Sequence, residues 1–298
     1  MVIKVTFLGT AEQIPSASRN HTAVLLNYDG ENILVDCGEG TQRQFRKAKL
    51  NPCKVTRILI THWHGDHVLG LPGLLSTLAL SGYNKTLYIY GPKGTKQFIR
   101  EMLKVFGFKK KYEIKTEDVE GKFFETKDFY LEAEKMQHGI PCNAYNFVKK
   151  GLIRIDKKKM KKFKLVQGPH LAKLKQGKDI SYKGKKYKAK NLTYTEGDKK
   201  ISFVFDTLDN KKIVKFVKGA DLFICESSFS DEIKDHAKEH LHLTAKQAAA
   251  NAEKAKVKKL VLTHLSSRYE KAPKKILDEA QKEFKYTVIA KDLDNFKI

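Results

Sequence analysis

Residues 61–70 read Thr-His-Trp-His-Gly-Asp-His-Val-Leu-Gly and directly follow the apolar run Ile58-Leu59-Ile60. Imidazole nitrogens and carboxylate oxygens are the usual ligands of Zn²⁺ and similar divalent ions. Four such ligands so close in sequence do not fit comfortably around one ion, so the spacing predicts two ions on a loop at the end of a buried strand. Gly65 is expected to let this loop fold tightly. The four ligand candidates are His62, His64, Asp66 and His67.

The spacing His-x-His-x-Asp-His is the signature of the metallo-β-lactamase superfamily. Two further segments narrow the resemblance, Asp-Cys-Gly-Glu-Gly-Thr-Gln-Arg-Gln at 36–44 and Thr-His-Leu-Ser-Ser-Arg-Tyr at 263–269. Both are similar to motifs of the ribonuclease Z family, as is Phe-Leu-Gly-Thr at 7–10. The resemblance implies an α/β fold, specifically a four-layer αβ/βα sandwich. It also implies an endoribonuclease that removes the 3′ trailer from precursor tRNA.

Hydrophobic periodicity supports the α/β class independently, because short strand-like runs alternate with helix-like segments. Tyr28-Asp29-Gly30 is a plausible hairpin turn between the second and third strands. Strands are expected at 2–8, 22–27, 31–36, 57–60 and 86–90, and helices at 40–48, 69–80 and 94–106.

A short internal repeat points to two related halves. Residues 57–62 and 259–264 share one form, a basic residue, an apolar strand, a threonine and a histidine. Two half-domains that each end a strand in a histidine at a shared edge would produce this pattern. Chance similarity between two buried strands would produce it as well.

The chain is strongly basic, with 58 Lys and Arg against 34 Asp and Glu and a formal net charge of +24. Such an excess favours a polyanionic partner, nucleic acid before membrane surface. Residues 149–190 alone carry 17 basic and two acidic residues. We predict that they form a protruding basic arm inserted into a single domain of residues 1–298, with an unstructured basic loop as the alternative. Gly168-Pro169 and the following helix-like segment resemble the tRNA-gripping arm of the family, which makes Gly168, Pro169, Lys173 and Lys175 candidate RNA contacts.

The cysteines and the hydropathy pattern suggest a cytoplasmic protein. Cys37, Cys53, Cys142 and Cys225 are scattered and form no Cys-x-x-Cys pair, as expected for reduced thiols. No signal peptide is expected at the start, and no apolar stretch approaches the ~20 residues that would span a membrane.

Three further ligand candidates follow apolar strands elsewhere in the chain: His138, Asp206 and His264. The resemblance implies two Zn²⁺ ions, with Mn²⁺ or Mg²⁺ as alternatives, and Asp206 as the ligand they share. One ion would take His62, His64, His138 and Asp206, and the other Asp66, His67, His264 and Asp206. Phe205 stands where the family has glycine, and a bulky residue there could tilt the Asp206 carboxylate.

The resemblance also assigns the catalytic groups. Asp66 would orient the water that attacks phosphorus and accept its proton, and His242 would protonate the leaving oxygen. His240 is a rival by proximity, but Thr244 and Gln247 fix the register on His242. Glu226 would hold the His242 imidazole in place, although its neighbours in the sequence differ from the family pattern. The products would be a tRNA with a 3′-OH and a trailer with a 5′-phosphate.

Contacts to the acceptor end are expected from two more segments. Residues 15–20 resemble a family loop in which Ala17 replaces a lysine, so Arg19 and Asn20 are candidates. Arg268 follows His264 and could bind a phosphate, or form a structural salt bridge.

Two other functions fit parts of this pattern. A small-molecule phosphodiesterase needs the same metals but no basic arm. A non-catalytic RNA-binding module would be expected to have lost ligands, and here all seven are present. The family also implies a homodimer, for which the apolar segment 69–80 is a candidate interface.

Overall fold

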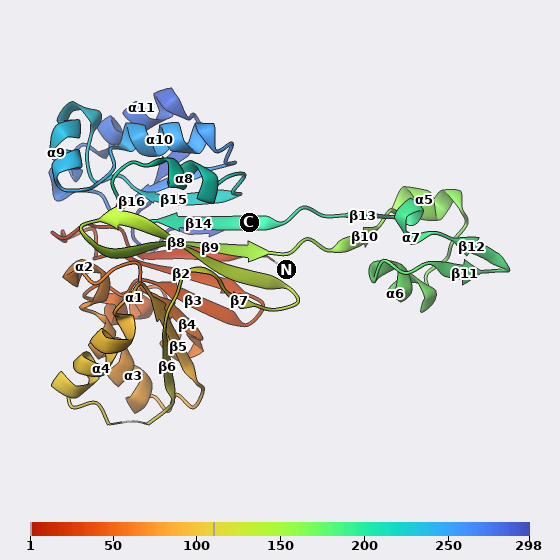
Figure 1. Ribbon diagram of the computed structural model, residues 1–298, viewed down its shortest axis with the longest axis horizontal. Helices are drawn as coiled ribbons and strands as arrows, with labels where there is room; N and C mark the ends of the chain where they lie inside the picture. The colour runs from red at the N-terminus through yellow and green to blue at the C-terminus, as the bar shows by residue number, and fades with distance from the viewer. Residues whose placement is uncertain (1, 110) are drawn as a thin grey trace. The chain divides into compact units, whose positions relative to one another are not determined.

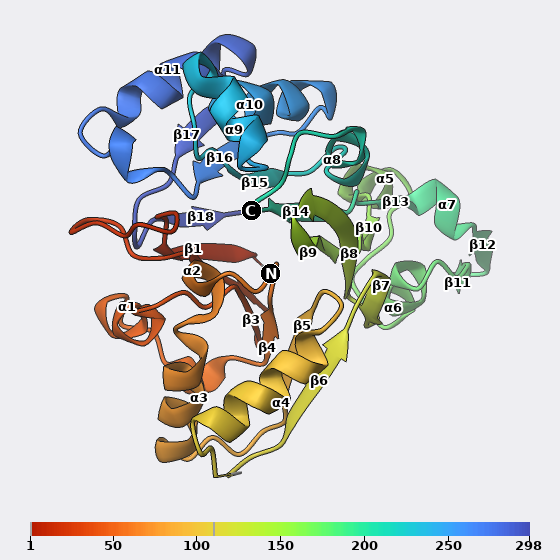
Figure 2. The same ribbon diagram turned by 60° about the vertical axis from the view of Figure 1, so that its left-hand side comes forward.

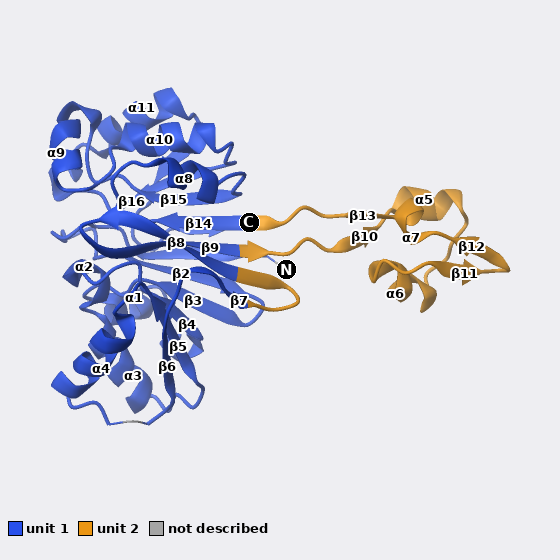
Figure 3. Ribbon diagram, in the orientation of Figure 1, with its two compact units in different colours: residues 1–124, 131–147, 200–298 blue, residues 125–130, 148–199 orange. Residues whose placement is uncertain are grey.

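The computed structural model describes residues 2–109 and 111–298, and the chain divides into two compact units (Figure 3). The larger, here called the sandwich unit, comprises residues up to 124 together with 131–147 and 200–298. The smaller, here called the basic unit, comprises 125–130 and 148–199. The expected arm at 149–190 lies within the basic unit, which is longer and includes a second segment.

The first seven-stranded sheet of the sandwich unit is antiparallel at one side and parallel at the other. Its hairpin turns at Asp29 and Gly30, which have φ values of 45° and 85°, as a two-residue turn between twisted strands requires. In sheet order the strands are β18 (Asn295–Lys297), β1 (Lys4–Gly9), β2 (Ala23–Tyr28), β3 (Glu31–Val35), β4 (Arg57–Leu59), β5 (Leu87–Gly91) and β6 (Ile114–Asp118).

The second seven-stranded sheet has the chain's other long parallel segment, from β14 to β17. In sheet order the strands are β17 (Thr287–Ile289), β16 (Leu260–Thr263), β15 (Leu222–Glu226), β14 (Lys199–Val204), β9 (Ile140–Lys149), β8 (Phe129–His138) and β7 (Gly121–Glu125). Phe147 on β9 packs edge-on against Tyr28 on β2, and Tyr145 donates a hydrogen bond to the carbonyl of Ile60. These contacts join the inner faces of the two sheets.

Helices cover the outer face of each sheet, which completes the four-layer αβ/βα sandwich (Figures 1 and 2). On the first sheet lie α1 (Thr41–Lys47), α2 (Gly65–Val68), α3 (Leu71–Leu80) and α4 (Thr95–Val105). On the second lie α8 (Lys211–Phe216), α9 (Lys234–Glu239), α10 (Ala245–Lys254) and α11 (Pro273–Glu283). Short 3₁₀ turns occur at Pro52–Lys54, Asp231–Ile233 and Ser267–Tyr269. The α/β class and the sandwich expected from the sequence are therefore confirmed.

The predicted helix 69–80 corresponds to α3, which starts two residues later than expected and ends at the same residue. The chain forms the short helix α2, passes through Leu69 and Gly70, and starts α3 at Leu71. Gly70 donates a hydrogen bond to the carbonyl of Cys37, and a Cβ there would lie 2.0 Å from the carbonyl oxygen of Gly38. Gly65 does not provide the tight loop expected of it, because it is the first residue of α2.

The internal repeat corresponds to equivalent strands in the two sheets. β4 and β16 each lie between parallel neighbours, and each leads into a threonine and a histidine. Parallel strands bring their carboxyl ends to one edge, so His62 and His264 are delivered to the same side of the sandwich.

The basic unit has a small apolar core of its own, so it is folded rather than the unstructured basic loop considered as the alternative. Met160, from within the lysine run, packs with Leu171 against a buried cluster of Leu165, Leu174, Ile180, Ala189 and Leu192. Its elements are β10 (Ile153–Ile155), α5 (Lys157–Lys162), α6 (His170–Lys175), β11 (Ile180–Tyr182), β12 (Lys185–Tyr187), α7 (Ala189–Leu192) and β13 (Thr193–Thr195).

Across the described residues, none of the helices combines the length and the apolar character needed to cross a membrane.

Candidate active site

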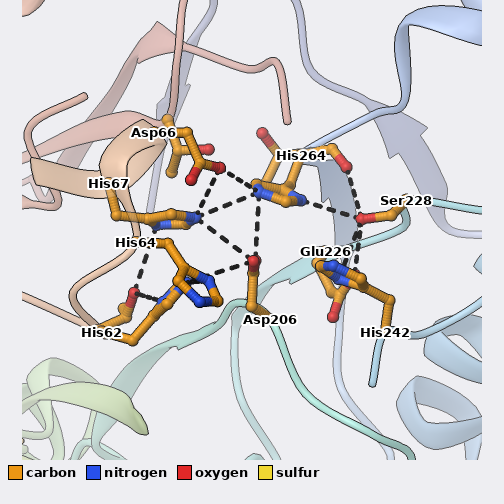
Figure 4. A network of polar contacts seen from close by, with 12 residues as sticks. His62, His64, Asp66, His67, Asp206, Glu226, Ser228, His242 and His264 are labelled. Atoms are coloured by element: carbon orange, nitrogen blue, oxygen red, sulfur yellow. Dashed lines mark hydrogen bonds and ion pairs between the residues drawn. The ribbon is translucent and has the colours of Figure 1, made fainter. Parts of the chain in front are cut away.

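The structure brings the seven expected ligands together at the carboxyl ends of strands. Figure 4 labels six of them, all except His138. In the first group, His64 Nδ1 lies 3.1 Å from His62 Nε2 and 3.2 Å from His138 Nε2. The Oδ2 atom of Asp206 lies 3.5 Å from both Nε2 atoms. His62, His138 and Asp206 are buried, and His64 is exposed, so this group is open on one side.

The second group is wholly buried and is formed by Asp66, His67, His264 and Asp206. His67 Nε2, His264 Nε2 and Asp66 Oδ2 are mutually 3.2 Å apart. Asp206 contributes to this group as well, because its Oδ2 lies 3.5 Å from His67 Nε2 and its Oδ1 lies 3.2 Å from His264 Nε2. Asp206 is therefore shared by the two groups. Phe205, next to it, is fully buried and does not move the carboxylate away from either one.

The donor atoms fit a pair of bound cations. A neutral imidazole carries one N–H. In four of the five histidines, Nδ1 lies beside an oxygen on the side of the ring away from the other ligands, here called an outer oxygen. The proton is then on Nδ1, and Nε2 has a lone pair that faces the other ligands. The outer oxygens belong to Thr61, Leu241, Asp36 and Ser228, for His62, His138, His67 and His264 respectively. Ligands of a tetrahedral Zn²⁺ at 2.0–2.1 Å lie about 3.3 Å apart, close to the distances here. Asp206 Oδ1 accepts no hydrogen bond from any described residue, as expected of an atom reserved for a metal.

The strand ends hold these residues in an unusual backbone conformation. Asp36, Asp206 and His264 have φ values of 57°, 27° and 54°, in the left-handed region that side chains other than glycine rarely adopt. Leu241, whose carbonyl faces His138, has a φ of 58°. Such conformations persist only where the surrounding structure enforces them, and they concentrate at functional sites.

Asp36 is a site residue to which the sequence assigned no role. Its buried Oδ2 lies 2.7 Å from His67 Nδ1 and accepts a hydrogen bond from the Thr61 hydroxyl, while its Oδ1 accepts one from the Thr61 amide. This carboxylate fixes the His67 ring and makes its inner nitrogen more basic. The sequence carried one signal, because Asp36 directly follows the apolar run of a predicted strand. The structure shows that this strand is parallel to the strand before His62.

His242 lies beside the second group and is held by Glu226. The His242 Nδ1 is 2.9 Å from Glu226 Oε2, and the buried Glu226 also accepts hydrogen bonds from the Thr207 amide and the Ser228 hydroxyl. The Ser228 hydroxyl lies 3.0 Å from His264 Nδ1 and connects this pair to the ligands. Ser228 is a second site residue that the sequence analysis missed.

The buried charges determine the protonation of these groups. Burial alone would lower the pKa of His242, but the carboxylates of Glu226 and Asp206 together outweigh it and raise the pKa to about 9. Burial would raise the pKa of Asp66 and Asp206, yet neighbouring imidazoles, His67 for the first and His264 for the second, hold both pKa values well below their usual range. At neutral pH the site thus combines the ionised side chains of Asp66 and Asp206 with a protonated His242.

Known proteins resemble this chain over its whole length. The sequence pattern of the metallo-β-lactamase superfamily matches residues 18–142. A ribonuclease Z of Nanoarchaeum equitans is 36% identical, with 97% of this chain and 92% of that protein covered. A ribonuclease Z of Methanosarcina mazei is 35% identical over 100% of this chain and 98% of that protein. The chain belongs to the ribonuclease Z family.

Structural similarity agrees with this membership. The crystal structure of the short form of human tRNase Z superposes with a TM-score of 0.70 at 30% identity, covering 98% of each chain. Ribonuclease Z proteins are hydrolytic nucleases with a metallo-β-lactamase fold, and this fold uses divalent metal ions. As a member of the family, this chain is a hydrolytic nuclease with the same fold.

Two residues predicted to touch RNA on the basis of ribonuclease Z motifs make internal contacts in this structure. Arg19 is only 9% exposed, and its Nη1 donates hydrogen bonds to Thr10 Oγ1 and to the carbonyl of Ala290. In this structure the Arg19 guanidinium joins the end of the first strand to the segment at Ala290, and substrate binding by Arg19 stays a prediction. The side-chain amide of Asn20 donates to the Glu39 carbonyl, which also makes its contact internal.

The other candidate RNA contacts of the ribonuclease Z pattern are accessible. Arg268 is exposed and lies 5.3 Å from the Phe229 ring, and its contact is this aromatic face rather than a salt bridge to any described carboxylate. In the basic unit, Pro169, Lys173 and Lys175 are exposed at helix α6 and Gly168 is half-buried.

Proposed function

We propose that this chain is an endoribonuclease that removes the 3′ trailer from precursor tRNA. The observation that carries the proposal is the convergence of seven ligands on the shared carboxylate of Asp206, with His242 beside them. A binding module without catalysis would have no need for this set. The names of the relatives, ribonuclease Z and tRNase Z, supply the class of substrate.

The ligand set would hold two divalent ions, and we propose Zn²⁺ because imidazole predominates among the donors. His62, His64 and His138 would hold one ion, Asp66, His67 and His264 the other, and Asp206 both. A pair of such ions lowers the pKa of water and neutralises the phosphate that is attacked.

Two side chains of the protein itself would move protons. Asp66, ionised through its histidine neighbours, orients the attacking water and accepts its proton. His242, protonated through Glu226, donates a proton to the departing 3′ oxygen. Water oxygen forms the new bond to phosphorus as the bond to the 3′ oxygen breaks, so the tRNA retains a 3′-OH and the trailer a 5′-phosphate.

The basic unit would hold the tRNA body. Its lysines are exposed along α5, α6 and the β11–β12 hairpin, where they can neutralise phosphates. Such contacts read the shape of an A-form helix rather than its sequence, because the base edges of double-stranded RNA are poorly accessible. The exposed Tyr194, 55% accessible, offers a surface for stacking with a base.

We also propose that the protein functions as a cytoplasmic homodimer. The helix α3 buries Leu71, Leu74 and Leu78, whereas Leu80 at its end and Leu69 before it are 90% and 62% exposed. Exposed leucines at the two ends of a helix would contribute apolar surface to such an interface. Molar mass in solution tests this part separately.

The decisive experiment incubates an end-labelled precursor tRNA with the purified protein and Zn²⁺ or Mn²⁺ and maps both new ends. We expect one cut after the acceptor stem, with a 3′-OH and a 5′-phosphate. The matched control is Asp66→Ala, which should bind the precursor and leave it intact. A product with a 2′,3′-cyclic phosphate, or cleavage by the Asp66→Ala protein at the normal rate, would refute the proposal.

A further inference from the structure

A second group of metal-binding side chains lies on the surface at helix α9, outside the ligand set described above. It consists of His236, Glu239 and His240, whose ligand atoms all lie within 4.8 Å of one another. His236 is half-buried, while Glu239 and His240 are exposed.

The helix fixes the geometry of this group. The amide of His240 donates a hydrogen bond to the carbonyl of His236, so the two residues are one helical turn apart on the same face. Their ring centroids are 4.3 Å apart. The His236 ring lies against Phe229, at 5.1 Å, whereas Glu239 and His240 are exposed. Two imidazoles and a carboxylate can therefore approach the separation that one ion requires.

We propose that His236, Glu239 and His240 form a further binding site for a divalent transition metal. Two imidazoles with one carboxylate favour Zn²⁺, Ni²⁺ or Cu²⁺ over Mg²⁺ and Ca²⁺, which prefer oxygen ligands. With three ligands at an exposed position the site binds more weakly than the buried pair, so it fills only when the metal is abundant.

The position of the group connects it to His242. The chain turns back directly after α9, and the amide of His242 donates to the carbonyl of Ala237 inside the helix, at 2.8 Å. Leu241, in this same turn, presents its carbonyl to His138. Phe229 contacts both the His236 ring, at 5.1 Å, and the His242 ring, at 5.8 Å.

A metal that bridges the last turn of α9 therefore stabilises the turn that carries Leu241 and His242. The inferred consequence is a link between the supply of transition metal and the rigidity of this segment. The inference depends on α9 and its neighbours alone, and it stands whether or not the substrate is precursor tRNA.

The experiment counts bound Zn²⁺ by equilibrium dialysis and follows amide hydrogen exchange in residues 234–242. The wild-type protein should bind one more equivalent than His240→Ala. Added Zn²⁺ should slow exchange in the segment for the wild type only. Glu239→Gln should weaken the extra equivalent by about tenfold or more, since even outer-shell changes cost ~10–100-fold in metal affinity. The matched control, Glu253→Gln, changes an exposed glutamate on α10 and should behave as wild type.

The comparison is repeated in an Asp206→Asn background, where the buried pair of ions is expected to be weakened. If the Asp206→Asn protein still binds one equivalent of Zn²⁺ more than the Asp206→Asn, His240→Ala protein, the extra ion is assigned to α9. This result does not depend on the proposed nuclease activity. Equal numbers of bound ions in the wild type and His240→Ala would overturn the inference, as would equal slowing of exchange in both proteins.

Discussion

The sandwich unit and the basic unit place their charges in opposite ways. In the first, carboxylates and imidazoles from distant strands are buried against one another, and nearly every one has a fixed polar partner. In the second, a small apolar core supports exposed lysines, most of which point into solvent. Buried charges are set in place before substrate arrives and suit bond breaking. Solvated charges suit attraction over a distance that salt screens.

This contrast implies that chemistry and recognition can be altered separately. Changes in the sandwich unit should affect the rate of cleavage at saturating RNA. Changes in the basic unit should affect RNA affinity and its dependence on salt.

The largest effect is expected for Asp206→Asn. Loss of the shared carboxylate should release bound metal and lower precursor cleavage by at least ~10³-fold, because a two-metal site contributes several kcal/mol to catalysis. Metal content and cleavage rate are measured together. Asp209→Asn, an exposed change three residues further on, is the control and should retain both. If Asp206→Asn lowered tRNA affinity as much as it lowered the cleavage rate, cleavage and RNA recognition would not be separable between the two units.

The next effect concerns His242. His242→Ala should slow cleavage by about 10²–10⁴-fold, the usual contribution of a general acid. The imidazole must be protonated to act, so activity should fall as the pH rises through its raised pKa of about 9.

Glu226→Gln removes a charge that raises this pKa, so the alkaline limb of the pH–rate profile should move to lower pH. Rates from about pH 6 to about pH 10 test this expectation. An alkaline limb at the same pH in both proteins would show that Glu226 does not set the protonation of His242.

A smaller effect on affinity is expected from the basic unit. Changing the five lysines of α5 (Lys157, Lys158, Lys159, Lys161 and Lys162) to glutamine should weaken precursor binding and make it less sensitive to salt. Each lost phosphate contact lowers the slope of log K against log salt by roughly 0.7–0.9. Hydrolysis of a small diester such as bis(p-nitrophenyl) phosphate should not change.

The matched control changes five exposed lysines of the sandwich unit: Lys211, Lys215, Lys218, Lys254 and Lys256. If both sets weaken binding equally, net charge rather than the basic unit attracts the RNA.

The smallest effect is expected for Asp36→Asn, because Asp36 contacts the ligand His67 and not the metal. The amide retains part of the hydrogen bonding to Thr61 but lacks the charge beside His67, so metal affinity should fall by about 10–100-fold. Excess Zn²⁺ should then restore cleavage. Failure of added metal to restore activity would indicate that Asp36 acts on more than metal affinity.

The sequence predicted those parts of the site that local pattern and strand ends reveal. His62 to His67 are contiguous, and Asp206 and His264 each follow an apolar strand, so convergence at a sheet edge could be expected. Arg19 could not be placed, because its partner carbonyl on Ala290 lies 271 residues away in sequence. The core of the basic unit was missed because its few apolar residues, such as Met160 and Leu165, are scattered among lysines and come together only in the folded unit.

The left-handed backbone at Asp36, Asp206 and His264 has a consequence for the thermal stability of this protein. Glycine at any of these positions would suit the local backbone better and would abolish a metal contact or its support. Selection for heat resistance alone, without a demand for catalysis, should therefore tend to erase the centre. If all three side chains survived such selection, bound metal would stabilise the fold by at least the free energy that these backbone conformations cost.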